Sequence, residues 1–207
     1  MNRTSLLLLT ALCLPACDQT SGVSDTGPAN GSATVAKHYE GPKPEGVSTP
    51  NDAVTTTFYI PQAAIGDMYE IEAGELALVR GRAPEVKAFA RQMVEDHRKT
   101  SAQLKAFVAD HPTNIAIPQN MDARRQAMLA NLNQAGPDEF DSVYVGQQAA
   151  AHQEALNLHG SYARRGDYPA LKALATKTVD LISAHKRHAE ALATRFGPEA
   201  RPVPSGT

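Results

Sequence analysis

Three widely spaced histidines and one glutamate fall within apolar runs of this chain. His97, His152 and His185 each interrupt residues that recur every three or four positions, which is the spacing of a buried helix face. Glu70 lies in a similar run of small residues: Ala63, Gly66, Gly74 and Ala77. At similar depth in a bundle, these four side chains would surround one point, and such a ligand set suits zinc, iron or copper.

A hydrogen-bonded polar layer is the alternative for the same histidines, because buried polar groups need partners. Four polar side chains could serve as those partners: Glu70, Asp96, Asp141 and Tyr144. Di-iron bundles carry Glu-x-x-His on two helices. Non-ligating residues stand three places before the three histidines instead: Val94, Ala149 and Ile182. This missing motif favours the polar layer over a tight metal site.

Other chemistry leaves little trace in the sequence. We find no Gly-x-Ser-x-Gly elbow, phosphate-binding loop or Rossmann glycine pattern, so no catalytic residue is assigned and a non-catalytic protein is favoured. The balance of 20 basic and 22 acidic residues argues against nucleic-acid binding through a positive field. His159 and His188 are expected at the edges of the apolar stripes, in contact with water.

The elements that must position these residues are helices, because apolar residues recur at three and four positions and not at two. We expect four long helices and one short one, at about 61–80, 84–111, 120–133, 137–166 and 167–197. Asn120 and Asp167 are the expected N-caps of the third and fifth. The connection before Pro137 is long enough to cross a bundle, which predicts an all-α, ferritin-like four-helix bundle.

The first residues predict export. Arg3 precedes an apolar run at 6–14 that is too short to span a bilayer, and Leu14-Pro15-Ala16-Cys17 resembles the lipobox of bacterial lipoproteins. We therefore expect a signal peptide at 1–16, a lipidated Cys17, and a Gly-, Pro-, Ser- and Thr-rich tether at 17–56. The bundle would occupy 57–196 and a tail 197–207. An ordinary signal peptide cut near Ala16 is the alternative.

The expected location is the periplasmic side of the cell envelope, with the membrane as a partner through the lipid on Cys17. The choice between inner and outer membrane stays open. Cleavage before Cys17 would leave no second cysteine, so the exported domain would fold without an intrachain disulfide.

Several segments together carry a family resemblance: MYEIEAGELA at 68–77, VKAFARQMVEDH at 86–97, FDSVY at 140–144, and the later His152 and His185. They resemble a bacterial family catalogued as domain of unknown function 4142, often labelled putative outer-membrane protein. The resemblance spans about 58–193 and implies a secreted ferritin-like bundle without a settled activity. This chain departs from the family at two positions: it has Ala151 where the family usually has an acidic residue, and Asp180 where the family usually has a proline.

These observations predict a lipid-anchored cell-envelope bundle that acts as a non-catalytic binding or envelope-stress module. The alternative is a metal-binding protein, redox-active or metal-handling, that uses Glu70, His97, His152 and His185.

Overall fold

A computed structural model describes residues 54–111 and 113–197, and this part of the chain forms five α-helices and no strand. The helices are α1 (Thr56–Arg80), α2 (Pro84–Asp110), α3 (Ala123–Gln134), α4 (Phe140–Arg165) and α5 (Pro169–Phe196). The expected all-α bundle of four long helices and one short helix is confirmed. Cys17, the expected signal peptide, and most of the expected tether and tail lie outside the described residues.

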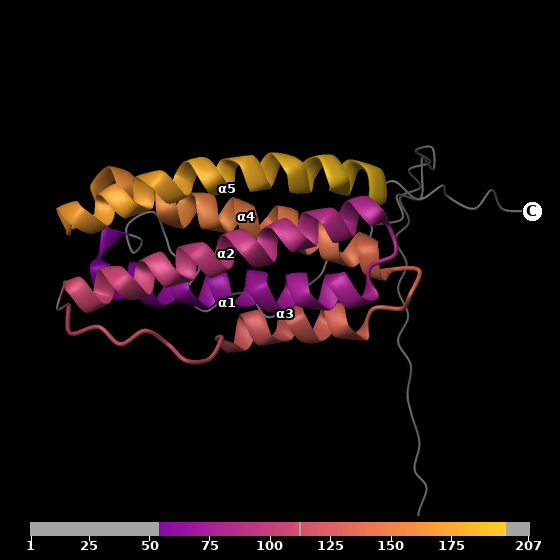
Figure 1. Ribbon diagram of the computed structural model, residues 1–207, viewed down its shortest axis with the longest axis horizontal. Helices are drawn as coiled ribbons and strands as arrows, with labels where there is room; N and C mark the ends of the chain where they lie inside the picture. The colour runs from indigo at the N-terminus through magenta and orange to yellow at the C-terminus, as the bar shows by residue number, and fades with distance from the viewer. Residues whose placement is uncertain (1–53, 112, 198–207) are drawn as a thin grey trace, which may run out of the picture. The chain divides into compact units, whose positions relative to one another are not determined.

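Two helical hairpins make up the bundle, α1 with α2 and α4 with α5 (Figure 1). The connection between them runs along the bundle and includes α3, which packs against α1 and α4. Because this connection returns the chain to the end where α2 began, α4 runs parallel to α2 (Figure 1). None of the described helices is long and apolar enough to cross a membrane.

The first helix begins five residues before Pro61, the expected start. Tyr59 and Ile60 are buried in the core, so tertiary packing extends the helix across the proline. Asp167, expected to cap the last helix, instead accepts hydrogen bonds from the backbone N–H (2.9 Å) and hydroxyl (2.5 Å) of Thr56. This carboxylate therefore joins the start of α1 to the turn between α4 and α5.

Two other helices begin later than expected. The N-cap of α3 is Asp122 and not Asn120, because the Asp122 side chain accepts a hydrogen bond from the backbone N–H of Arg125 at 2.8 Å. Residues 137–139 form a turn before α4, in which the carbonyl of Gly136 accepts hydrogen bonds from the N–H groups of Glu139 and Phe140. Local side-chain and backbone hydrogen bonds thus decide both starts.

Small residues let α1 and α2 approach closely beside Glu70. A methyl group at Gly74 would lie 2.7 Å from Val94 Cγ2 and 3.1 Å from the Ala90 carbonyl oxygen, closer than side chains normally pack. The small residues of α1, Ala63, Gly66, Gly74 and Ala77, form a small-residue ridge, and at Gly74 this ridge permits the close approach of α2.

Two apolar clusters divide the core along the bundle. In α2, Met93 belongs to one cluster and Leu104 to the other. In α4 the corresponding residues are Val145 and Leu158, and in α5 they are Ala189 and Ala175. In the sequence of each helix, one of the three histidines lies between the residue of the first cluster and the residue of the second cluster. The histidines are therefore at one level of the bundle, between the two clusters.

Candidate metal centre

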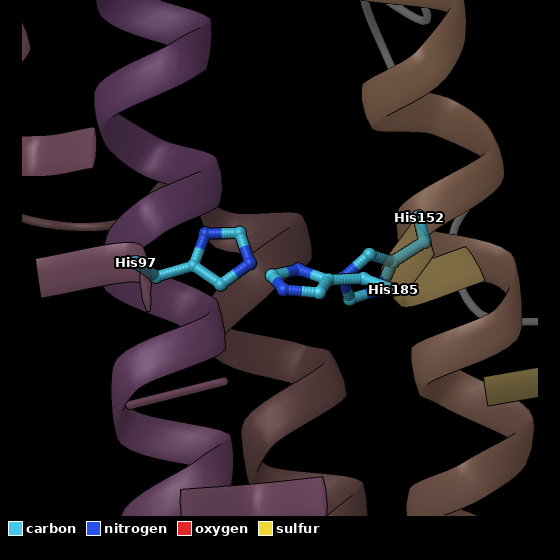
Figure 2. Close-up of side chains that lie close together, drawn as sticks. All are labelled: His97, His152 and His185. Atoms are coloured by element: carbon cyan, nitrogen blue, oxygen red, sulfur yellow. The ribbon is translucent and has the colours of Figure 1, made fainter. Parts of the chain in front are cut away.

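His97, His152 and His185 come together in the middle of the bundle. Their ring centroids are separated by 5.7 Å (His97 to His152), 5.5 Å (His97 to His185) and 5.4 Å (His152 to His185). One ligand nitrogen from each ring lies within 4.8 Å of the other two. Figure 2 shows the His97 ring pointing from α2 toward the other two rings. The three histidines therefore form a nearly equilateral triangle of imidazoles, which we call the histidine triad.

Each ring of the triad makes one hydrogen bond to the protein. His97 Nδ1 lies 2.8 Å from Asp67 Oδ1 on α1, and His185 Nε2 lies 3.1 Å from Asp96 Oδ2 on α2. His152 Nδ1 donates to the backbone carbonyl of Gln148 at 2.9 Å. These bonds fix the orientation of each ring.

The second nitrogen of each ring has no hydrogen-bond partner among the described residues: His97 Nε2, His152 Nε2 and His185 Nδ1. All three side chains are buried, with exposed fractions of 3%, 1% and 1%. An unpaired buried polar atom costs about 1–3 kcal/mol. The polar layer expected from the sequence thus provides a hydrogen-bond partner for only one of the two nitrogens of each ring. Metal-binding histidines show this pattern, in which one nitrogen is held by a carboxylate or carbonyl and the other binds the ion.

Neighbouring carboxylates make the electrostatics of the three rings unequal. Burial tends to lower the pKa of His97, but the hydrogen bond to Asp67 and attraction to Asp67, Glu70 and Asp96 raise it above its ordinary value. Burial lowers the pKa of His152. Burial and the charges of the other two histidines lower the pKa of His185 to about 4. His152 and His185 are therefore neutral near pH 7, the form in which imidazole binds a metal.

Two expected site residues lie beside the triad. Asp96 accepts the hydrogen bond of His185. Burial tends to raise the pKa of the Asp96 carboxyl, but hydrogen bonds from His185 and Lys99 lower it below its ordinary value. Glu70 is buried, and its Oε1 atom lies 3.8 Å from His152 Nδ1, while Oε2 has no hydrogen-bond partner among the described residues. Glu70 stands outside the set of close ligand atoms, which within the described residues comprises the three histidines.

The other two expected residues form no hydrogen bond or ion pair with the triad within the described part of the chain. Asp141 accepts hydrogen bonds from the backbone N–H groups of Arg82 (3.0 Å) and Ala83 (2.8 Å), so it secures the turn between α1 and α2. Tyr144 is fully buried, and burial raises the pKa of its hydroxyl well above the ordinary value.

Asp67 belongs to this site but is not among the residues predicted from the sequence. It lies four residues after Ala63 and three before Glu70, on the same small-residue ridge of α1. The Thr100 hydroxyl also donates to Asp67 Oδ1, at 2.8 Å. The ridge periodicity was the available signal, since it places position 67 on the face turned toward α2.

His159 is buried, which corrects the expectation of a water-exposed position. Its Nδ1 atom lies 2.8 Å from the Tyr59 hydroxyl oxygen, and Tyr59 stacks on Tyr162 with centroids 4.1 Å apart. Burial lowers the pKa of His159 to about 4. His188 is exposed as expected.

Once His97 has released its proton, the three imidazoles of the triad can hold a divalent transition-metal ion. Each nitrogen bound to zinc is about 2.0–2.1 Å from the ion, so the nitrogens of a tetrahedral site lie roughly 3.4 Å apart. The ligand nitrogens of the triad, which lie within 4.8 Å of one another, are close to this spacing. Three protein ligands would also leave a coordination position for water or another small ligand.

Two comparisons relate this chain to known proteins, one by sequence family and one by structure. The family described as Domain of unknown function (DUF4142) matches residues 41–192. A solved structure titled "CopM in the Cu(II)-bound form" is similar with a TM-score of 0.59 and 20% sequence identity; the match covers 69% of this chain and 97% of that one. At this identity the likeness establishes the shared fold. No curated protein is significantly similar to the chain in sequence.

Proposed function

We propose that this chain, which belongs to the DUF4142 family, binds one divalent transition-metal ion between His97, His152 and His185. The observation that carries the proposal is the set of three buried, unpartnered ring nitrogens at one level of the bundle. The histidine geometry supports the metal-binding alternative better than the hydrogen-bonded layer that the sequence favoured, because a closed layer would pair these atoms.

Copper and zinc are the ions that the donor set favours. Imidazole suits Zn²⁺, Cu²⁺ and iron, and for a given nitrogen site affinity is highest for Cu²⁺ in the common divalent series. The bundle shares its fold with a protein whose solved form is titled as Cu(II)-bound, which also supports copper. Asp67, Glu70 and Asp96 place negative charge around the triad, and this charge would stabilise a bound cation.

Metal analysis of the full chain, purified without a histidine tag, tests this proposal. We expect one Cu²⁺ or Zn²⁺ per chain after loading, and a thermal transition that falls when a chelator removes the ion. His97→Ala, His152→Ala and His185→Ala should each abolish most of this chelator sensitivity. His188→Ala is the matched control, because His188 lies one turn beyond His185 on the same helix and is exposed. A native chain that retains no metal after loading would refute the proposal.

We further propose that the metal site acts at the cell envelope, on a domain held to the membrane by lipid on Cys17. The lipobox-like sequence before Cys17 supports this anchor. Cys17→Ser should move the protein from the membrane fraction to the soluble fraction and remove the mass of the acyl chains. An unmodified Cys17 in the mature wild-type protein would contradict the proposed lipid anchor. This result would not bear on the proposed metal site.

A further inference from the structure

A pocket on the side of the bundle reaches the histidine triad from the His97 side. It has a volume of about 160 Å³ and is lined by residues of α1 and α4, with Arg124 and Arg125 of α3. Asn157 at its edge is exposed, whereas His97 and Ile182 in its wall are 3% and 1% exposed. Ile182 lies one turn before His185 on α5. The pocket therefore extends from the surface to the interior level at which the triad lies.

Two unpartnered polar atoms belong to residues in the wall of this pocket, His97 Nε2 and Glu70 Oε2. Both side chains are more than nine-tenths buried. Buried polar atoms without protein partners are satisfied by water or a ligand. His97 and Glu70 thus bring one unpartnered nitrogen and one unpartnered carboxylate oxygen to the wall of the pocket, although the two atoms themselves are shielded from solvent.

We propose that this pocket is the entry and exit route for the metal ion, an inference that rests on the proposed function. The ion would pass Gly66 and Glu70 on α1 and meet His97 first. His152 and His185 are not among the lining residues, so they would complete the site after the ion has passed the pocket wall.

The charges along the pocket suit a cation. Four carboxylates line it, against two guanidinium groups: Asp67, Glu70, Asp122 and Glu154 against Arg124 and Arg125. Glu154 pairs with both arginines, with Arg124 Nη1 at 2.8 Å and Arg125 Nη2 at 3.0 Å from its Oε2 atom. The arginine charges at the α3 side are therefore neutralised in part, while the acidic groups near His97 attract an incoming ion.

A larger side chain at position 66, in place of Gly66, would obstruct this route without changing a metal ligand. A methyl group added at Gly66 would meet no heavy atom within 4 Å, so a larger side chain would extend into the open pocket. Gly146 is a matched control because it also lies within a long helix, also has nothing within 4 Å of an added methyl group, and does not line the pocket.

Stopped-flow mixing of the full chain with Cu²⁺ tests the route, with tyrosine fluorescence as the signal because the chain has six tyrosines and no tryptophan. Release is followed by mixing the loaded protein with a chelator. We expect Gly66→Leu to slow both binding and release by about tenfold or more and to leave Kd unchanged, because an obstruction affects passage in both directions. Gly146→Leu should bind and release Cu²⁺ at the wild-type rates.

Wild-type rates in a folded Gly66→Leu protein would overturn the entry route while leaving the proposed function intact. A rise in Kd with an unchanged binding rate would also overturn it, because that result indicates damage to the site itself. Gly66→Ala, which adds a single methyl group, should slow both rates less than Gly66→Leu and covers the case in which the larger variant does not fold. Failure of the wild-type chain to bind Cu²⁺ would instead refute the proposed function and the route with it.

Discussion

The Nδ1 atom of His97 lies 2.8 Å from the Oδ1 atom of Asp67, and this contact links α2 to α1 at the level of the histidine triad. It leaves His97 Nε2 as the nitrogen available to a ligand. A carboxylate that accepts the N–H of a metal-binding histidine orients the ring and increases its basicity. Metal affinity should therefore depend on Asp67, although Asp67 lies outside the triad.

Asp67→Asn should weaken Cu²⁺ binding by about tenfold to a hundredfold, because the amide keeps a hydrogen-bond acceptor but removes the negative charge. Isothermal titration at a pH well above the ordinary imidazole pKa measures this effect with little competition from protons. Asp180→Asn, an exposed change on α5, is the control and should bind normally. Equal affinities in wild type and Asp67→Asn would show that Asp67 does not support the site.

His159 should make the protein less stable as the pH falls from about 6.5 toward 4. Its folded pKa of about 4 lies below the ordinary value of 6.5, so the unfolded chain binds a proton in this range and the folded chain does not. The expected loss from this group between pH 7 and pH 5 is about 2 kcal/mol in the free energy of unfolding. Urea unfolding of His159→Gln at both pH values should show a correspondingly smaller loss than wild type.

Tyr59→Phe is the control for this effect. It removes the hydrogen bond to His159 but leaves the histidine buried, and burial is the cause of the lowered pKa. The variant should therefore lose similar stability at both pH values and retain the wild-type pH dependence. A wild-type pH dependence in His159→Gln would contradict the assignment.

Gly74→Ala should destabilise the bundle by about 1–3 kcal/mol, since the added methyl group would lie 2.7 Å from Val94 Cγ2 in a tightly packed interface. Gly146→Ala offers the matched comparison: with nothing within 4 Å, it should stabilise the protein by up to about 1 kcal/mol through helix propensity alone. Thermal or chemical unfolding separates the two variants. Equal effects at the two positions would refute the close contact between α1 and α2.

Asp141→Ala should lower the free energy of unfolding by about 0.5–2 kcal/mol, because the backbone N–H groups of Arg82 and Ala83 lose their acceptor. Asp141→Asn retains an acceptor oxygen and should cost less. Neither variant should change Cu²⁺ affinity, since Asp141 contacts the turn and not the triad. A large loss of affinity in either one would place Asp141 in the metal site after all.

Helix identity and the buried faces followed from sequence periodicity. The spacing of three and four residues placed His97, His152 and His185 on inner stripes, and each side chain is buried. Helix ends were harder to predict from the sequence, because they depend on individual hydrogen bonds and on contacts with distant elements. The start of α1 shows this, since burial of Tyr59 and the bond between Thr56 and Asp167 carry the helix past Pro61.

The sequence alone determined which faces of the helices carry imidazoles, because a side chain's direction around a helix follows from its position in the repeat. Only the tertiary structure decided that the three rings share one level, since that depends on how far each helix slides along its neighbours. It also decided which nitrogen of each ring remains free. Asp67 and Asp96 reach their histidines from other helices across 30 and 89 residues of chain, and no local pattern encodes such contacts.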